Sequence, residues 1–399
     1  MKEETRMIKK IFLLTALISV TGLASAQSIT EFLERVSASN PEIAAYGKLL
    51  EARRIEARTG NAPPDPFVSA GFMPGNSDEA GDKKIWSVSQ SFDFPTKYLL
   101  QKKINNNTII LAEQEYSQAR MLIMLEAEQL ALDLIYNTRA LNTLLERKKG
   151  YEVLRSAWGK MLENGEATIM DYNNILLELS AVSLEINRRE SETQMLREKL
   201  DYMSGSDAAE IGYAEYPVME VPDFDLLITE KSESHPAYLI PEIEYSISRQ
   251  EVSLSRSGSL PEIQVGYGSE IVAGTAYTGP VAGLSIPLWA NSNKVRSASA
   301  AADYSDALRE ATLLKLKSEA RNDYSGIMAL QKSVSEIRGI IESGGGTKYP
   351  DKALEAGEIS VSTYFMYMKA LYESEDRLLE LENEYHKALA ALLDHRLIK

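Results

Sequence analysis

The sequence repeats itself at long range, and this duplication limits the folds that the chain can adopt. The stretch at 163–172 returns at 355–364, 192 residues later, and in each copy a Gly stands three residues before a Thr or Ser. Gly suits the left-handed residue that ends a helix, and Thr or Ser suits the N-cap of the next helix. The pattern predicts a tight helical hairpin in each copy, at Gly165 and Thr168 and again at Gly357 and Ser360.

Three further landmarks recur in the same order, which indicates that a whole unit is duplicated. A segment similar to Asn40-Pro41-Glu42 recurs at 235–237, and one similar to 66–72 recurs at 261–267, both at an offset of 195 residues. A segment similar to 92–95 recurs at 284–287, at an offset of 192 residues. We expect two copies that together form one structural unit. Their predicted bounds are 27–206 and 229–399, with an irregular linker at 207–228.

The first 26 residues have the features of a secretory signal peptide. Lys9 and Lys10 precede an apolar run, and Ala24-Ser25-Ala26 is a small-x-small cleavage site. A membrane anchor is the alternative interpretation, but the run is shorter than the roughly 20 residues that a spanning helix needs. We therefore expect 1–26 to be removed on export.

Composition and motifs exclude several classes of protein. The chain contains no Cys, which excludes disulfides, zinc-thiolate sites and a lipid on an N-terminal Cys. A formal net charge of −15 argues against a nucleic acid partner. The sequence shows no nucleophile motif, no zinc-protease motif and no phosphate loop. We expect no enzymatic activity, no cofactor and no metal site.

The first copy reads as helix, strand pair, long helix and returning helix. Asn40 is a candidate N-cap for a helix that runs to about Thr59, and strands are expected at 67–73 and 85–94. No proline interrupts 97–162, whose apolar positions recur at helical spacing; at ~1.5 Å per residue this helix would span roughly 100 Å. The returning helix carries a heptad-like series at Ile175, Leu179, Val182 and Ile186 and ends near 203–206.

The second copy repeats this order with one interruption. A helix is expected from Pro236, strands at 262–272 and 279–288, and a long helix from about Asn291. Gly344-Gly345-Gly346 and Pro350 disfavour a continuous helix, so we expect a loop or kink at 343–350. The returning helix then continues to the C-terminus.

The assembled pattern resembles the TolC-family outer membrane factors. The resemblance rests on Asn-Pro-Glu at 40–42, the strand exit from Ser91 to Pro95 with a looser echo at 285–287, and the two tips after Gly165 and Gly357. It covers about 28–396, and the order and duplication of the motifs make it specific. It implies a mainly α, TolC-like fold, in which three chains pool four strands each (65–95 and 261–289) into a transmembrane β-barrel above an α-helical barrel.

The resemblance also implies roles for particular residues. The two tips correspond to the end that meets a periplasmic adaptor, so Gly165, Glu166, Gly357 and Glu358 are the adaptor-contact candidates. Pro95 and Pro287 match the strand-to-helix swivel, the point in the family where each barrel strand bends into a helix. Many members carry acidic gate residues just past the tip. Asp171 matches that place in the first copy, but its equivalent is Thr363, so any acidic gate would be three-fold.

The function that the resemblance implies is a passive exit duct in a tripartite efflux pump. Its partners would be a periplasmic adaptor, an inner-membrane pump of RND or ABC type and outer membrane lipid. The compact build is similar to heavy-metal efflux members. Type I secretion is an alternative, and a periplasmic coiled-coil scaffold without a pore is the rival from another class, although it leaves the strand pairs without a role.

Histidines suggest no site of their own. Two histidines and a carboxylate lie near the C-terminus, at His386, Asp394 and His395, but they are too few to indicate a metal site. We expect them to be solvated residues at a helix end. His235 precedes Pro236 at an N-cap position, which predicts a structural role.

Overall fold

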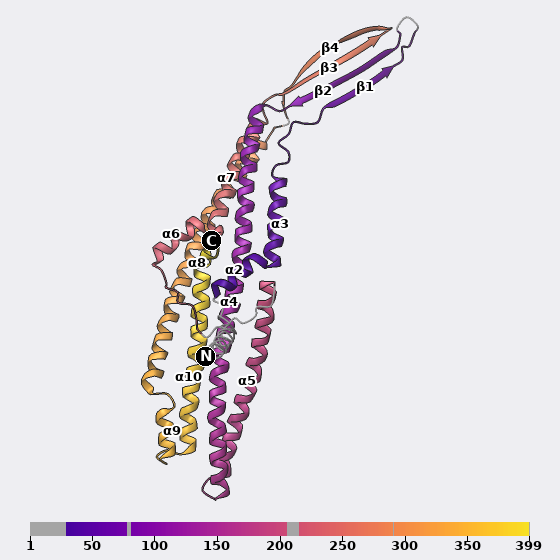
Figure 1. The fold of residues 1–399 in the computed structure, drawn as a ribbon. Coiled ribbons are helices and arrows are strands. Elements are labelled where there is room, and N and C mark those ends of the chain that lie inside the picture. The colour runs from indigo at the N-terminus through magenta and orange to yellow at the C-terminus, as the bar shows by residue number, and fades with distance from the viewer. Residues whose placement is uncertain (1–28, 78–80, 206–214, 290, 399) are drawn as a thin grey trace, which may run out of the picture. The chain divides into compact units, whose positions relative to one another are not determined.

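The computed structural model describes residues 29–77, 81–205, 215–289 and 291–398 (Figure 1). The predicted signal at 1–26 lies outside the described residues. The chain divides into two compact units, each described here by itself. Among the described residues, unit 1 takes in 29–41, 123–205, 215–221 and 325–393, and unit 2 takes in 42–77, 81–122, 222–289, 291–324 and 394–398.

The first copy follows the predicted order of elements from α3 onward, and a helix that was not predicted, α2, precedes them (Figure 1). Its elements are α2 (Ile29–Ser39), α3 (Pro41–Glu56), β1 (Phe67–Met73), β2 (Lys83–Phe92), α4 (Pro95–Glu163) and α5 (Ile169–Ser204). The uninterrupted helix predicted at 97–162 is confirmed by α4, which has 69 residues. Gly205, with φ of 69°, ends α5 within the predicted range.

The second copy contains one helix that the sequence interpretation missed. Its elements are α6 (Phe224–Ser234), α7 (Pro236–Ser257), β3 (Glu262–Val272), β4 (Thr275–Ser285), α8 (Lys294–Gly344), α9 (Lys348–Glu355), α10 (Val361–Leu392) and a 3-10 turn, η1 (Asp394–Ile398). Helix α6 begins inside the segment expected to be irregular to 228, because Asp223 caps it by accepting hydrogen bonds from the Asp225 and Leu226 amides.

The expected break in the second copy is confirmed, and it is short. Gly345 and Gly346 have φ of 73° and 60°, values that glycine adopts easily, and they separate α8 from α9. Pro350 lies in the first turn of α9, where proline is tolerated because that amide has no helical acceptor. The glycines, and not the proline, therefore make the interruption.

Unit 2 contains a four-stranded antiparallel sheet with the order β1-β2-β3-β4. Strand β3 lies where the sequence predicts it, whereas β4 begins four residues earlier than the predicted 279. Phe67 pairs with Ser89 in β1–β2, Ser91 with Gln264 in β2–β3, and Glu262 with Ser285 in β3–β4. The β2–β3 pair joins the two copies of the repeat.

Unit 1 is a layer of helices held by side chains that cross from each helix to the next. Arg189 of α5 donates to Asn137 of α4, Asp133 of α4 pairs with Lys387 of α10, and Glu382 of α10 pairs with Arg338 of α8. The order across the layer is therefore α5-α4-α10-α8, as the lower part of Figure 1 shows. Among the described residues, no helix carries an apolar stretch long enough to cross a membrane.

Candidate functional site

The first helical tip is a closed capping structure. Gly165 has φ of 77°, its amide donates to the Leu162 carbonyl, and the Glu166 amide donates to the Met161 carbonyl, which is the Schellman pattern of a helix end. Thr168 then caps α5: its Oγ1 accepts from the Asp171 amide at 3.1 Å. The predicted hairpin is confirmed.

The second tip repeats this construction. Gly357 has φ of 71°, and its amide donates to the Leu354 carbonyl while the Glu358 amide donates to the Ala353 carbonyl. Ser360 Oγ accepts from the Thr363 amide at 3.2 Å. Both glycines are needed for backbone conformation alone, since a Cβ at either position would meet no atom within 4 Å.

The structure places the predicted contact residues at the surface. Glu166 and Glu358 are exposed beside their glycines. Asp171 is half-buried, and its carboxylate accepts a 2.6 Å hydrogen bond from Thr168 Oγ1. Thr363 makes the corresponding 2.9 Å contact with Ser360 Oγ. The two gate candidates thus have the same local role in completing a cap, and only Asp171 adds a charge.

The four-stranded sheet has two faces of different chemistry. One face carries exposed apolar side chains from all four strands, among them Val68, Trp86, Val88, Val265, Tyr267 and Leu284. The rings of Trp86 and Tyr267 lie 6.3 Å apart across β2 and β3. The apolar surface exposed by this sheet therefore needs a partner that is itself apolar.

The opposite face of the sheet is rich in hydroxyl groups and glycine. Ser87 and Ser69 contact each other through their Oγ atoms at 2.8 Å, and Gln264 Nε2 donates to Ser89 Oγ at 3.0 Å. Gly266 lies opposite Ser89, and a Cβ there would come within 2.6 Å of the Val88 carbonyl oxygen. This face is the more polar of the two, although Phe67, Met73, Tyr277 and Val281 are exposed on it.

The two swivel candidates lie near the places where a strand is followed by a long helix. Pro95 is the first residue of α4, and Pro287 follows β4 and precedes α8 by several residues. The Lys97 ammonium pairs with the Asp93 carboxylate at 2.7 Å beside Pro95. Near Pro287, the Asn291 amide group donates to the Ser255 carbonyl at 2.7 Å.

Arg147 connects the two hairpins of unit 1, and no sequence pattern marks it. Its side chain, on α4, is only 6% exposed. It donates to three groups of α10, which are the carboxylates of Asp376 and Glu375 and the carbonyl of Tyr372. Burial disfavours the charged guanidinium, but the hydrogen bonds and charges of the two acids outweigh it, so the pKa of Arg147 is raised. Tyr151 stacks on Phe365 in the same region, with ring centroids 6.1 Å apart.

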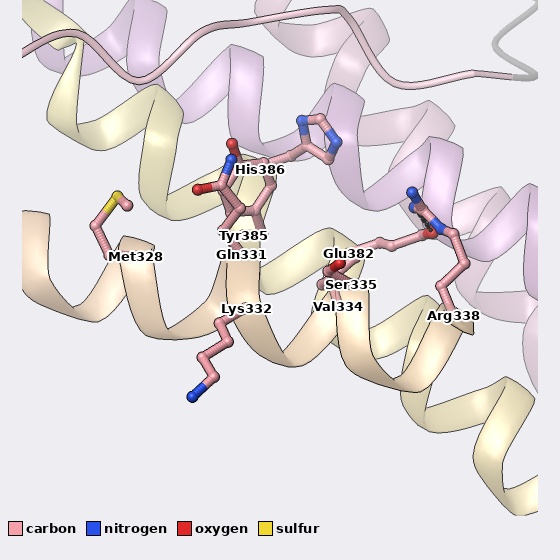
Figure 2. A pocket seen from close by; sticks show the side chains of 9 residues that line it. All are labelled: Met328, Gln331, Lys332, Val334, Ser335, Arg338, Glu382, Tyr385 and His386. Carbon is pink, nitrogen blue, oxygen red and sulfur yellow. Dashed lines mark hydrogen bonds and ion pairs between the residues drawn. The ribbon is translucent and has the colours of Figure 1, made fainter. Parts of the chain in front are cut away.

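A groove of about 700 Å³ lies between α8 and α10 in unit 1 (Figure 2). Figure 2 shows Arg338 and Glu382 meeting across it, while Lys332 points away from Glu382. Glu382 is 5% exposed and pairs with both Arg139 and Arg338 at 2.6 Å. Its charge is thereby balanced, and these pairs hold α4, α10 and α8 together.

The expectation of solvated histidines near the C-terminus is wrong. The ring of His386 stacks on Tyr216 with centroids 4.3 Å apart, and burial lowers the pKa of His386 to about 4. His395 is 3% exposed and contacts Glu230 at 3.2 Å. Asp394 accepts from Lys231 at 2.8 Å. Asp394 and His395 are covered because η1 packs against α6. Among the described residues, no cluster of three or more possible ligands could hold a metal ion.

Comparisons with solved structures identify the fold. The chain superposes on the outer membrane channel OprN with a TM-score of 0.77 at 14% identity, covering 92% of this chain and 89% of that one. For CusC, described in terms of transmembrane channel formation, the TM-score is 0.73 at 12% identity, with 92% and 91% covered. For the outer membrane protein VceC of Vibrio cholerae it is 0.73 at 14% identity, with 92% and 95% covered.

These likenesses confirm the TolC-like fold that the sequence predicts. No family sequence model matches the chain, and no curated protein matches it by sequence. OprN is described as an outer-membrane channel, CusC in terms of transmembrane channel formation and VceC as an outer membrane protein. The lean toward the heavy-metal branch is not confirmed by these comparisons.

Proposed function

We propose that three copies of this chain form an outer membrane channel that serves as the passive exit duct of a tripartite efflux pump. The observation that carries the proposal is the two-faced sheet, in a fold shared with outer membrane channels. A periplasmic adaptor and an inner-membrane pump would deliver the substrate to the duct.

The sheet supports membrane insertion by several copies together. Strands β1 and β4 are its two edges, and one chain leaves both without a second neighbouring strand. Because β1 and β4 run in opposite directions, β4 of one copy can pair with β1 of the next. Three copies would close twelve strands into a barrel, with the apolar face toward lipid and the hydroxyl-rich face toward the lumen.

Helix α5 supports the same assembly independently. Its buried side, at Ile175, Val182 and Ile186, packs toward α4. About 180° around the helix, at ~100° per residue, lies an outer stripe that is 51–71% exposed, made of Met170, Leu177, Leu184, Met195 and Tyr202. Since α5 and α8 are the two ends of the four-helix layer, the outer stripe of α5 would meet α8 of the next copy.

Cysteine crosslinking tests this assembly, because the natural chain has no cysteine. Leu184 follows Gly165 by 19 residues and Ile340 precedes Gly357 by 17, so the two lie at similar distances from their tips. The double variant with Leu184→Cys and Ile340→Cys should form covalent dimers and trimers on oxidation. Leu184→Cys with Val153→Cys is the matched control, since Val153 is 68% exposed but lies on α4, inside the layer.

Different crosslinking results separate the rival assemblies. Dimers from Leu184→Cys alone would show that two α5 helices face each other, as in a scaffold, and would contradict a closed ring. Recovery in outer membranes as a detergent-stable trimer supports the duct. Release with soluble periplasmic protein would refute it in favour of the pore-free coiled-coil scaffold.

The tips are proposed as the adaptor-binding end. Gly165 and Gly357 set the shape, and Glu166 and Glu358 offer exposed carboxylates. Asp171, present once per chain, would place three acids near the mouth of a trimer. Reversing the tip charges with Glu166→Lys and Glu358→Lys should weaken adaptor capture while trimers persist. Unchanged capture and efflux would show that the tips are not the contact.

The class of substrate that the duct exports distinguishes an efflux duct from a type I secretion duct. Restored resistance to small toxic compounds or metal ions in a strain that lacks its own exit duct would support efflux. Restored export of a protein substrate alone would favour a type I secretion duct.

A further inference from the structure

His235 occupies the junction of α6 and α7 in unit 2, where it acts as the N-cap of α7. Its ring nitrogen Nδ1 accepts a hydrogen bond from the Ala237 amide at 3.0 Å. Pro236, the first residue of the helix, has no amide hydrogen, and the Tyr238 and Leu239 amides donate to the His235 carbonyl. The imidazole is thus the acceptor for the first amide of α7.

This hydrogen bond fixes the protonation state of the ring. A backbone amide can only donate, so Nδ1 must present its lone pair and the hydrogen of the neutral ring resides on Nε2. Nε2 lies 3.2 Å from Asp394 Oδ2 and donates to it. Burial alone would raise the pKa of Asp394, but the His235 hydrogen bond and the Lys231 charge outweigh it and hold the pKa below its usual value. Asp394 therefore remains an acceptor.

We propose that His235 is a pH-sensitive helix cap, whose protonation in mildly acidic surroundings releases the first turn of α7. The added proton binds Nδ1, the only ring nitrogen that carries no hydrogen in this tautomer, and displaces the hydrogen bond from the Ala237 amide. Both ring nitrogens then carry hydrogen, Nδ1 faces the Ala237 N–H donor to donor, and the cap is lost. Histidine is the side chain whose charge ordinarily changes between about pH 5 and 8.

The duplicated architecture supplies a comparison within the same molecule. Asn40 stands at the equivalent place between α2 and α3, at an offset of 195, and is 1% exposed against 7% for His235. Its side-chain amide donates to the Met203 carbonyl at 3.0 Å. Asparagine has no titratable group, so the junction in the first copy cannot respond to acid in this way.

Several other titratable or charged groups lie on the elements that meet at this junction. They are Glu230 and Lys231 of α6, Tyr238 of α7, Glu319 of α8, Arg120 of α4, and Asp394, His395 and Arg396 at the C-terminus. Asp394 contacts Nε2 of the ring, and Lys231 pairs with the same carboxylate. Burial lowers the pKa of the neighbouring His395 below its ordinary value. A response that belongs to His395 must therefore be distinguished experimentally.

Hydrogen exchange of the intact protein tests the proposal. Protection factors, which remove the intrinsic effect of pH on exchange, are measured at pH 7.5 and 5.5 for the amides of residues 237–240. Loss of an N-cap corresponds to roughly fivefold lower protection, and we expect this decrease on acidification. The amides of 42–45 at the start of α3 serve as the internal reference and should not change.

Two variants assign the response to one ring. His235→Asn imitates Asn40 and retains a side-chain oxygen for the cap, so the pH dependence at 237–240 should disappear. His395→Asn should retain it. Equal protection of the wild type at both pH values would overturn the proposal, as would a response that survives His235→Asn or vanishes in His395→Asn. If His235→Asn does not fold, Asp394→Asn tests the same point, because it should shift the response to lower pH.

Discussion

The guanidinium of Arg147 lies 4.3 Å over the ring of Tyr372, so a cation–π contact joins the two hairpins of unit 1 beside the ion pairs of Arg147. Replacing Arg147 with Met should lower the free energy of unfolding by about 2 kcal/mol, less than the 3–5 kcal/mol for a fully buried pair, since Asp376 is half exposed. The free energy of unfolding of Arg147→Lys should lie between those of the wild type and Arg147→Met. Chemical denaturation of the purified protein measures this, and wild-type stability of Arg147→Met would contradict it.

Glycine at the tips should matter through its positive φ alone. Gly165→Ala leaves the space around Cβ empty but forces a left-handed alanine, which costs about 1 kcal/mol. Gly150→Ala is the matched control, because Gly150 lies inside α4, where an added Cβ would also meet no atom within 4 Å, and the change there should stabilise the protein by up to about 1 kcal/mol. Thermal unfolding distinguishes the two, and equal shifts of the same sign would refute the explanation.

Glu128 makes the stability of unit 1 fall as pH rises. This side chain of α4 is 8% exposed, and burial raises its pKa to about 7. Because the folded state holds the proton more tightly than the unfolded state, the stability associated with this group is complete below about pH 4.3, the unfolded value, and is lost as pH rises to about 7. Glu128→Gln should raise the unfolding temperature at pH 8 and leave it nearly unchanged at pH 4.5. A gain that is the same at both pH values would refute this.

His386 should act in the opposite direction. Its folded pKa of about 4 lies below that of the unfolded chain, so its contribution is complete above about pH 6.5 and is lost as pH falls toward 4. His386→Phe retains a ring to stack on Tyr216 and removes the proton-binding group. The variant should lose less stability than the wild type between pH 6.5 and 4.5 in denaturant titrations. Identical acid profiles would show that another group is responsible.

The sequence was sufficient for elements whose boundaries are set by local chemistry. Gly165 and Gly357 end helices because of their own backbone freedom, and Thr168 and Ser360 begin them with their own side chains. Helix α6 could also have been predicted: α2 begins at Ile29, and the offset of 195 places its equivalent at Phe224, where α6 begins. The acidic and proline-containing composition of 207–228 concealed that correspondence.

Contacts between distant segments could not be predicted from the sequence. Nothing near Arg147 in the chain indicates that Asp376 will neutralise it, since the two are 229 positions apart. The same holds for Asp394 and His395, which are polar and close to the C-terminus and yet are covered by α6. Position along the chain is a poor guide to burial when a terminal segment packs against a helix from the other half of its own repeat.

The β2–β3 pair, where the two copies meet within one sheet, has a consequence for how the molecule can diversify. In the proposed ring, a half-length ancestor would need six identical hairpins, so every substitution would appear six times. Fusion of two halves allows alternate positions to differ. One tip can follow a broken helix while the other follows a continuous one, and one junction can carry the titratable His235 while its counterpart carries Asn40. Duplication thus turns a uniform ring into one with two independently mutable sets of parts.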